Sequence, residues 1–308
     1  MKGLHEKNGG NFVKKLLVVF LTLFFVLQMG IAQEEKKDEN ARNPEAGQAF
    51  NKGLNLARKG NFAEAAPEFQ NAIDAAETGF PDAHYMLAYC YKKLEDYPKS
   101  EEQFKKAIEV DKNFDKAYLA LGNLQSQMGK NDEATHTFNA ALQVNPQSPK
   151  AYFGLGKIYH DMGNHSKAIE NLTKAVELAD NYVLAYNVLG LSYKELGQFS
   201  NAAEAFRNAI ENEDRRIKKG TFYYRLGTTY LKLKKYNQAV DALSNAISMS
   251  RNSLIVAGSN FYMGEAFKNT NQKQKALKYY ERATKHSAWK QAAEYEIDLI
   301  KNPDKYAY

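Results

Sequence analysis

The stretch GNFAEAAPEFQNAI, residues 60–73, returns at residues 197–210 as GQFSNAAEAFRNAI. Both copies begin with a glycine, carry an aromatic residue two positions later, and then place small and aromatic residues at matching spacings. A pattern that recurs at a regular period is the sequence signature of a repeat architecture. The period of this pattern therefore decides the fold.

Seven copies of the pattern fill residues 46–290. In the fourth copy, Leu155, Gly156 and Tyr159 mark one segment and Ala168 and Leu172 mark a second. Both segments have the i, i+3, i+4, i+7 spacing of one face of a helix, so each copy predicts two helices. The copies span residues 46–79, 81–114, 115–148, 149–182, 183–216, 220–253 and 257–290.

The residue types at these positions suit a stack of helix pairs. Small residues such as Gly156 and Ala168 let two antiparallel helices approach to about 8–10 Å. Gly163 is expected to end the first helix, because glycine adopts the left-handed conformation at low cost. Each pair buries its apolar face only against its neighbours, so the unit is stable only in a stack.

The sixth and seventh copies each start 37 residues after their predecessor, with extra residues at 217–219 and 254–256. These extra residues predict a lengthened helix or a change of superhelical pitch.

The pattern resembles the tetratricopeptide repeat over about four-fifths of the chain. The resemblance rests on a small residue at the eighth position, an aromatic at the eleventh, alanine at the twentieth, an aromatic at the twenty-fourth and alanine at the twenty-seventh. Three departures are that Lys52 replaces the usual leucine, Gln125 replaces an aromatic, and only Pro146 keeps the closing proline.

The resemblance implies an all-α fold, a right-handed superhelical solenoid of antiparallel helix pairs. Residues 288–301 (AWKQAAEYEIDLIK) offer an apolar stripe and are expected to form a C-terminal capping helix, the fifteenth in the chain. Residues 302–308 are then a short tail.

The first 32 residues are typical of a signal peptide. Lys14 and Lys15 precede the apolar run LLVVFLTLFFVL, and the small residues Gly30 and Ala32 flank Ile31 where a signal peptidase would cut. We therefore expect an exported, periplasmic protein of bacterial type. The alternative is an uncleaved inner-membrane anchor facing the periplasm, because the run approaches the length of a spanning helix. Residues 33–45 have almost no apolar content and predict a disordered lead-in.

The sequence favours a non-enzymatic protein with no cofactor and no metal. His160 and His165 are two candidate ligands without a third, and a spacing of five does not place two imidazoles on one helical face. Cys90, the sole cysteine, is better explained as a small packed residue than as a nucleophile. The glycines follow the repeat and form no phosphate-binding loop.

Charge is unevenly distributed along the chain. Residues 33–214 contain 20 Lys and Arg against 28 Asp and Glu, whereas residues 215–308 contain 18 against 7. Export and the packing positions of many tyrosines argue against nucleic acid as a partner. Weak contact with anionic lipid or another polyanion, through a basic surface that includes Lys273, Lys275 and Lys278, is an alternative.

The resemblance also implies where a partner binds. In tetratricopeptide proteins the first helix of each repeat lines a concave groove, and its fifth and ninth positions commonly touch the ligand. The predicted groove residues are Phe50, Tyr85, Tyr89, Leu119, Asn123, Phe153, Lys157, Asn187, Leu191, Tyr224 and Phe261.

Five of the seven fifth positions are aromatic. The lysine-and-asparagine clamp that some family members use on a C-terminal carboxylate is not reproduced. An extended or helical segment with apolar anchors fits such a groove better. The alternative is that the rings only pack against the adjacent helix.

The leading functional hypothesis is a scaffold of the bacterial cell envelope. It would bind peptide segments of envelope proteins in the aromatic groove to assemble or hold a complex. The alternatives are a membrane-tethered structural component and a module that binds anionic lipid through its basic C-terminal third. The sequence leaves the identity of the partner and any homo-oligomerisation open.

Overall fold

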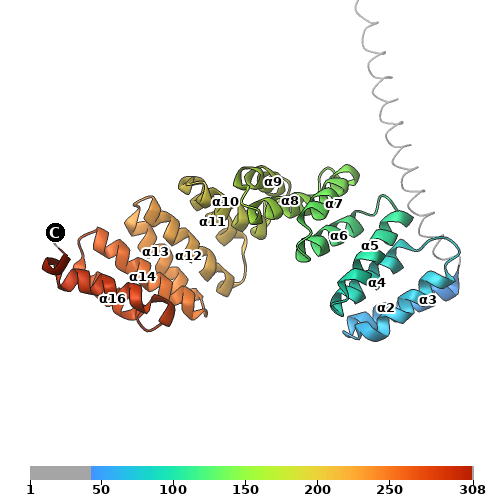
Figure 1. Cartoon of the computed structure of the whole chain (residues 1–308), viewed down its shortest axis with the longest axis horizontal. Helices are drawn as coiled ribbons and strands as arrows, with labels where there is room; N and C mark the ends of the chain where they lie inside the picture. The colour runs from blue at the N-terminus through green and yellow to red at the C-terminus, as the bar shows by residue number, and fades with distance from the viewer. Residues whose placement is uncertain (1–42, 307–308) are drawn as a thin grey trace, which may run out of the picture. The chain divides into compact units, whose positions relative to one another are not determined.

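The structure, a computed structural model, describes residues 43–306. The predicted signal peptide, most of the predicted lead-in and the last two residues of the tail lie outside the described residues. Residues 43–306 contain fifteen α-helices, a short 3-10 helix and no strand (Figure 1). The predicted all-α fold is confirmed.

The chain divides into two compact units between Leu124 and Gln125. The first unit contains α2 (Pro44–Arg58), α3 (Phe62–Ala75), α4 (Pro81–Lys93), α5 (Tyr97–Val110) and most of α6 (Asp115–Gln127). The second contains α7 (Asn131–Val144), α8 (Pro149–Asp161), α9 (His165–Leu178), α10 (Val183–Glu195), α11 (Phe199–Asn212), α12 (Arg216–Lys232), α13 (Tyr236–Met249), α14 (Ser253–Asn269), α15 (Lys273–Ala283), α16 (Ser287–Lys301) and the 3-10 helix η1 (Pro303–Tyr306).

Local signals at the ends of α8 show how each pair is built. The Ser148 side chain accepts a hydrogen bond from the Ala151 amide at 3.4 Å, and Pro149 occupies the first helical position, where its missing N–H costs nothing. The helix stops before Gly163, whose φ of +76° is left-handed as predicted. The α9 helix then begins two residues later and returns along α8.

Every pair uses this left-handed turn, although not always with glycine. Four of the turns carry a glycine at the left-handed position. In the other three, the residues are Glu95, Lys234 and Asn271, with φ values of 62°, 56° and 58°. Because a side chain in this conformation costs about 1–2 kcal/mol, the surrounding pair must impose the turn.

The two helices of a pair approach each other as closely as expected from the small residues at their contact. A Cβ atom on Gly156 would lie 2.6 Å from Cγ of Leu172, and a Cβ atom on Gly190 would lie 2.6 Å from the Phe206 ring. Leu172 and Phe206 are fully buried. Neighbouring pairs also pack on each other within the units, where α3 contacts α4, α7 contacts α8, α9 contacts α10, α11 contacts α12 and α13 contacts α14.

The two inserts lie at the start of first helices. Helices α12 and α14 each have 17 residues, whereas α8 and α10 each have 13. Residues 217–219 and 254–256 fall in the first turn of each long helix. The extra residues thus extend a helix without interrupting the pair.

The two ends of the described chain have their own local structure. Asn43 accepts a hydrogen bond from the Glu45 amide at 3.0 Å, which starts α2 at Pro44, two residues before the predicted repeat. Asp298 of α16 accepts bonds from Lys305 at 2.8 Å and Tyr306 at 2.5 Å, which fold part of the predicted tail into η1. Across residues 43–306, no helix has both the length and the apolar character needed to cross a membrane.

Candidate partner-binding surface

The eleven predicted groove residues all lie on the first helices of the pairs, and we call these positions the first-helix surface. In the first unit, Phe50 of α2 lies 4.9 Å from the ring of Phe80. Tyr85 of α4 lies 5.5 Å from Phe104 and 5.6 Å from Phe114. Burial raises the pKa of Tyr85. These rings are half-buried, so each packs on a neighbour and still exposes an edge.

The ninth positions of the first unit are more polar. Tyr89 lies 5.9 Å from Phe62, with the Lys93 amine 5.4 Å from the Tyr89 ring centre. Asn123 of α6 is exposed, and its Nδ2 donates to the Leu119 carbonyl at 2.6 Å. A partner on this unit would meet aromatic edges and one exposed amide.

In the second unit, the first-helix surface begins at α8. Phe153 lies 5.0 Å from Tyr182, which precedes α10. Lys157, one turn further on, is exposed and forms an ion pair with Asp161 of the same helix. Its charge is therefore partly neutralised within α8.

A polar contact joins the next two first helices. The Arg225 side chain of α12 donates a hydrogen bond to Oδ1 of Asn187 of α10. Leu191, one turn beyond Asn187, packs against the buried core, and Lys194 is half-buried another turn along. Burial lowers the pKa of both Arg225 and Lys194. Two cations therefore share a partly desolvated surface.

An aromatic cluster of Tyr224, Phe261, Tyr262 and Trp289 follows at the C-terminal end of the second unit. Trp289 of α16 lies 5.0 Å from Phe261 and 5.5 Å from Tyr262, and Tyr262 lies 6.1 Å from Tyr224. A Cβ atom on Gly258 would be 2.9 Å from the Trp289 ring. Burial, and to a smaller extent the nearby Tyr262, raises the pKa of Tyr224 to about 12. The capping helix thus brings its indole onto the first helix of the last repeat.

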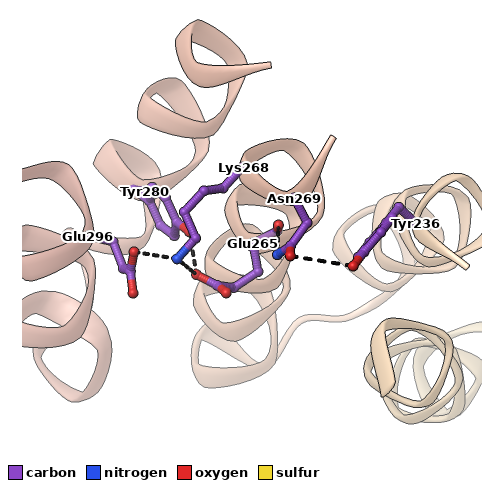
Figure 2. Close-up of polar contacts among 6 residues, drawn as sticks. All are labelled: Tyr236, Glu265, Lys268, Asn269, Tyr280 and Glu296. Atoms are coloured by element: carbon purple, nitrogen blue, oxygen red, sulfur yellow. Dashed lines mark hydrogen bonds and ion pairs between the residues drawn. The ribbon is translucent and has the colours of Figure 1, made fainter. Parts of the chain in front are cut away.

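A polar network ties the last three helices together (Figure 2). Lys268 Nζ of α14 lies 2.6 Å from Oε2 of Glu296 and 3.1 Å from Oε1 of Glu265, and the Tyr280 hydroxyl donates to Glu265. The same view shows Tyr236 donating to Asn269 at 3.4 Å. Glu265 holds a ninth position, but its charge is already satisfied by these neighbours.

The predicted basic surface lies on α15, where Lys273, Lys275 and Lys278 are all exposed. Lys275 donates to Gln272 at 2.8 Å, and its amine lies 5.3 Å from the centre of the Phe267 ring. Packing along this ring leaves the lysine charge in solvent.

An open pocket of about 320 Å³ lies at the turn between α12 and α13. Its lining residues are Lys234, Lys235, Tyr236, Asn237, Gln238 and Thr270. No predicted groove residue lines this pocket, which is separate from the first-helix surface.

The side chains considered for metal binding or nucleophilic chemistry are His160, His165 and Cys90. His160 and His165 lie on different helices, as their spacing predicted, and their ring centres are 5.2 Å apart because His165 starts the returning helix α9. His160 Nδ1 also lies 2.9 Å from Ser192 Oγ. Among the described residues, no group of three His, Cys, Asp or Glu side chains could hold a metal. Cys90 is fully buried, and burial raises its pKa to about 11.

Sequence reasoning missed Lys194 and Arg225, because neither occupies a fifth or ninth position of its repeat. Arg225 lies one residue after a fifth position, and Lys194 lies three residues after a ninth position. The sequence nevertheless contains a pattern that singles out these two residues. Neither cation has an acidic residue three or four positions away on its own helix, unlike Lys157 with Asp161. Charges without a partner on the same helix are candidates for contacts between helices or with a ligand.

Comparison with known proteins gives the same repeat along most of the chain. Family models described as tetratricopeptide repeat match residues 81–114, 104–136, 183–214, 220–253 and 259–286, and one described as TPR repeat matches residues 126–163 and 156–197. A search of curated proteins found no match.

Solved structures of similar fold come from several sources. The C-terminal part of a TPR repeat-containing protein from Cytophaga hutchinsonii has a TM-score of 0.66 at 17% identity, over 80% of this chain and 99% of that one. A tetratricopeptide repeat protein from Parabacteroides merdae has a TM-score of 0.56 at 16% identity, over 84% of this chain and 99% of that one. A chain of the APC/C hetero-tetramer Cut9-Hcn1 has a TM-score of 0.52 at 16% identity, over 81% of this chain and 54% of that one.

Proposed function

The chain belongs to the tetratricopeptide repeat family, and we propose that it holds peptide segments of envelope proteins on its first-helix surface. Proteins with this repeat are typically non-catalytic scaffolds for protein–protein interaction, and one structural neighbour is a complex of Cut9 with Hcn1. The role of this chain is then to assemble or hold a complex in the bacterial cell envelope.

The observation that carries this proposal is the row of half-buried side chains along the first helices. Phe153, Tyr224 and Phe261 each pack on another aromatic ring and keep part of their surface exposed. Rigid, partly desolvated rings are the residues on which binding energy usually concentrates in protein interfaces. The charged side chains at two of the ninth positions, Lys157 and Glu265, are already paired with neighbours, so a segment with apolar anchors fits these rings.

Photo-crosslinking tests the surface directly. A photoreactive amino acid replaces Asn123 or Lys157, which are exposed on first helices, and in a control it replaces Lys174, which is exposed on the second helix α9. We expect crosslinks to envelope proteins from the first two positions and none from Lys174. Equal or stronger crosslinking from Lys174 would place the partner on the other face and refute the proposal.

Partner identity would come from mass spectrometry of the crosslinked species. The double variant Tyr85→Ala, Phe153→Ala gives a second test, in which we expect capture of that partner to be lost. Each side chain is only half-buried, so the melting curve should stay near that of the wild type. Unfolding of the variant, or full retention of the partner, would contradict the role of these rings.

Export is part of the proposal and rests on the signal-like residues 1–32. Mass spectrometry of the protein recovered from the periplasm should give a mature N-terminus at Gln33. An intact Met1 in the membrane fraction would support the tethered alternative instead.

Binding to anionic lipid is the second candidate, favoured by the exposed lysines of α15. Replacing Lys273, Lys275 and Lys278 with glutamine should weaken binding to phosphatidylglycerol vesicles and flatten its dependence on salt. Unchanged binding would remove this candidate and leave the scaffold proposal intact.

A further inference from the structure

Each of the two inserts leaves one large aliphatic side chain in solvent. Ile217 of α12 is 48% exposed and Leu254 of α14 is 46% exposed. They are 37 residues apart, which is the offset between the sixth and seventh repeats, so they hold the same position on two first helices. Because α12 contacts α14, both side chains lie on one edge of the second unit. We call this edge, residues 213–219 and 250–256, the insert edge.

The backbone of the insert edge is held by contacts between its two segments. The Arg216 side chain donates a hydrogen bond to the Ser248 carbonyl at 3.1 Å. A Cβ atom on Gly220, one turn further along α12, would lie 2.8 Å from the amide nitrogen of Ser250, so the two backbones are in close contact. The Asn252 side chain then caps the start of α14. The start of each long helix is thus fixed by residues outside that helix.

The insert edge carries more positive than negative charge. Its two segments contain five Lys and Arg against two Asp and Glu. Of the two acids, Glu213 is buried and already paired with Arg215, with Oε1 and Nε 2.8 Å apart. Asp214 is exposed and is the other acid of these segments. The edge therefore attracts anions.

Three of the cations have no partner on the protein. Within the described chain, Lys218, Lys219 and Arg251 form no ion pair. Lys218 and Lys219 also lie in the first turn of α12, which contains no acidic residue and where the helix dipole opposes positive charge. An external anion at this edge would offset that repulsion.

The start of α10 shows that an exposed aliphatic residue need not be accompanied by cations. Leu184, the second residue of α10, is 51% exposed. Residues 178–186 contain no Lys or Arg, and their one charged residue is Asp180. The combination of aliphatic and basic side chains therefore accompanies the inserts, and Leu184 provides a matched control for it.

This combination matches the surface of an anionic membrane. Exposed aliphatic side chains gain free energy by entering the boundary between lipid headgroups and acyl chains. Each Lys or Arg close to an anionic membrane adds electrostatic attraction. A bilayer requires no complementary shape, so two aliphatic side chains that project from one basic edge are sufficient to engage it.

We propose that the insert edge docks on an anionic membrane. Ile217 and Leu254 enter the boundary between headgroups and acyl chains, and the cations Lys218, Lys219 and Arg251 contact the lipid phosphates. This inference goes beyond the scaffold proposal and concerns other residues than the lysines of α15. Those lysines follow the far end of α14, which is about 25 Å long, whereas the insert edge lies at its start.

A local fluorescent probe tests this docking in the full chain. In a Cys90→Ala background, the variants Ile217→Cys, Leu254→Cys and the control Leu184→Cys are each labelled with an environment-sensitive dye. Vesicles of phosphatidylethanolamine and phosphatidylglycerol should shift the emission of the dye at positions 217 and 254 to shorter wavelength, because it leaves water. The dye at position 184 should not respond. This readout is local, so it holds whether or not residues 1–32 are retained.

Two results with the probe would overturn the proposal. One is the absence of a shift at positions 217 and 254, or an equal shift at position 184. The other is an equal response to vesicles of phosphatidylcholine alone, which carry no net charge, because the cations would then have no role.

The contribution of charge is tested by combining Lys218→Gln, Lys219→Gln and Arg251→Gln. The lipid concentration that gives half of the shift at position 254 should rise about tenfold or more. None of the three residues is buried, so the melting temperature should stay near that of the wild type. An unchanged half-point in a folded variant would refute the role of these cations.

The glutamine variant of the three α15 lysines separates the two basic surfaces. It should leave the probe response at position 254 unchanged. If that variant alone lost the response, lipid would bind at α15 and the insert edge would be refuted. Photo-crosslinks from position 217 to an envelope protein, without any response to vesicles, would assign the edge to a protein partner and overturn the membrane proposal. Crosslinking from the first-helix surface is a separate measurement, so the scaffold proposal can stand or fall on its own.

Discussion

At the residue scale, the contact between Gly154 and Phe138 sets a strict limit on side-chain size. A Cβ atom on Gly154 would lie 2.4 Å from Cζ of the buried Phe138 ring. We expect Gly154→Ala to destabilise the protein by about 1–3 kcal/mol through overpacking, which exceeds the helix-propensity gain of about 1 kcal/mol. Its thermal melting point should fall.

Gly47→Ala is the matched control, since that glycine is also inside a helix and a Cβ atom added to it would have no neighbouring atom within 4 Å. It should raise the melting point slightly. Adding Phe138→Leu to Gly154→Ala should recover part of the loss by making room. A Gly154→Ala variant as stable as Gly47→Ala would show that the ring moves aside freely.

Cys90 gives a prediction about pH. Burial raises the pKa of its thiol to about 11, so the native thiol should react with a disulfide reagent far more slowly than the urea-unfolded thiol, whose pKa is about 8.5. The raised pKa also means that the thiol stabilises the fold below about pH 8.5 and that this contribution is lost as pH rises towards 11. The melting point of the wild type should therefore fall more steeply over this range than that of Cys90→Ala. Equal reactivity of native and unfolded thiols would contradict the burial.

Residue patterns predicted the packing positions better than the polar contacts. Gly156 and Leu172 could be assigned from spacing, because helix geometry fixes which residues of a pair meet. The bond between Asn187 and Arg225 joins residues 38 apart and depends on side-chain rotamers, which spacing does not determine. The approach of the His160 and His165 rings across a turn likewise depends on side-chain rotamers.

At the scale of elements, α16 protects the end of the second unit through Trp289. Trp289→Ala should cost about 1–2 kcal/mol, because the half-buried indole packs on both Phe261 and Tyr262. Hydrogen exchange should then accelerate in α14, α15 and α16 and stay unchanged in α8 and α9, since each pair depends mainly on its neighbours.

Tyr295→Ala on the same helix is the control. Tyr295 is 54% exposed and lies 6.0 Å from Tyr306, so its loss should have little effect on exchange or stability. Faster exchange that spread equally through α8 and α9 would show that the cap acts on the whole unit.

Helix positions were largely predictable, whereas helix ends were less so. The repeat located both helices of each pair, because its apolar spacing is strong. The start of α2 at Pro44 depends on the Asn43 cap, and η1 depends on bonds to Asp298, and neither signal belongs to the repeat. The lengthening of α12 and α14 was one of two outcomes that the inserts allowed.

At the scale of the whole molecule, the two compact units need not unfold together. Trp289 is the sole tryptophan and reports on the second unit, whereas far-ultraviolet circular dichroism reports on every helix. We expect the two probes to give different midpoints in urea, as arrays with local cores lose cooperativity. The double variant Trp289→Phe, Tyr89→Trp moves the tryptophan into the first unit. If the fluorescence and circular dichroism curves coincide in both the wild type and this variant, the chain unfolds as one body.

The lengthened helices α12 and α14 bear on how such a chain can change in evolution. The extra residues lie at the start of each helix, so they extend it by about one turn and leave the later positions of the repeat in register with one another. Duplication of a whole repeat also preserves register, because it adds a complete pair with its own turn. An insertion of one or two residues within a helix would rotate the small and large residues out of alignment. Changes of length should therefore be tolerated at the starts of helices or as whole repeats, and selected against within helices.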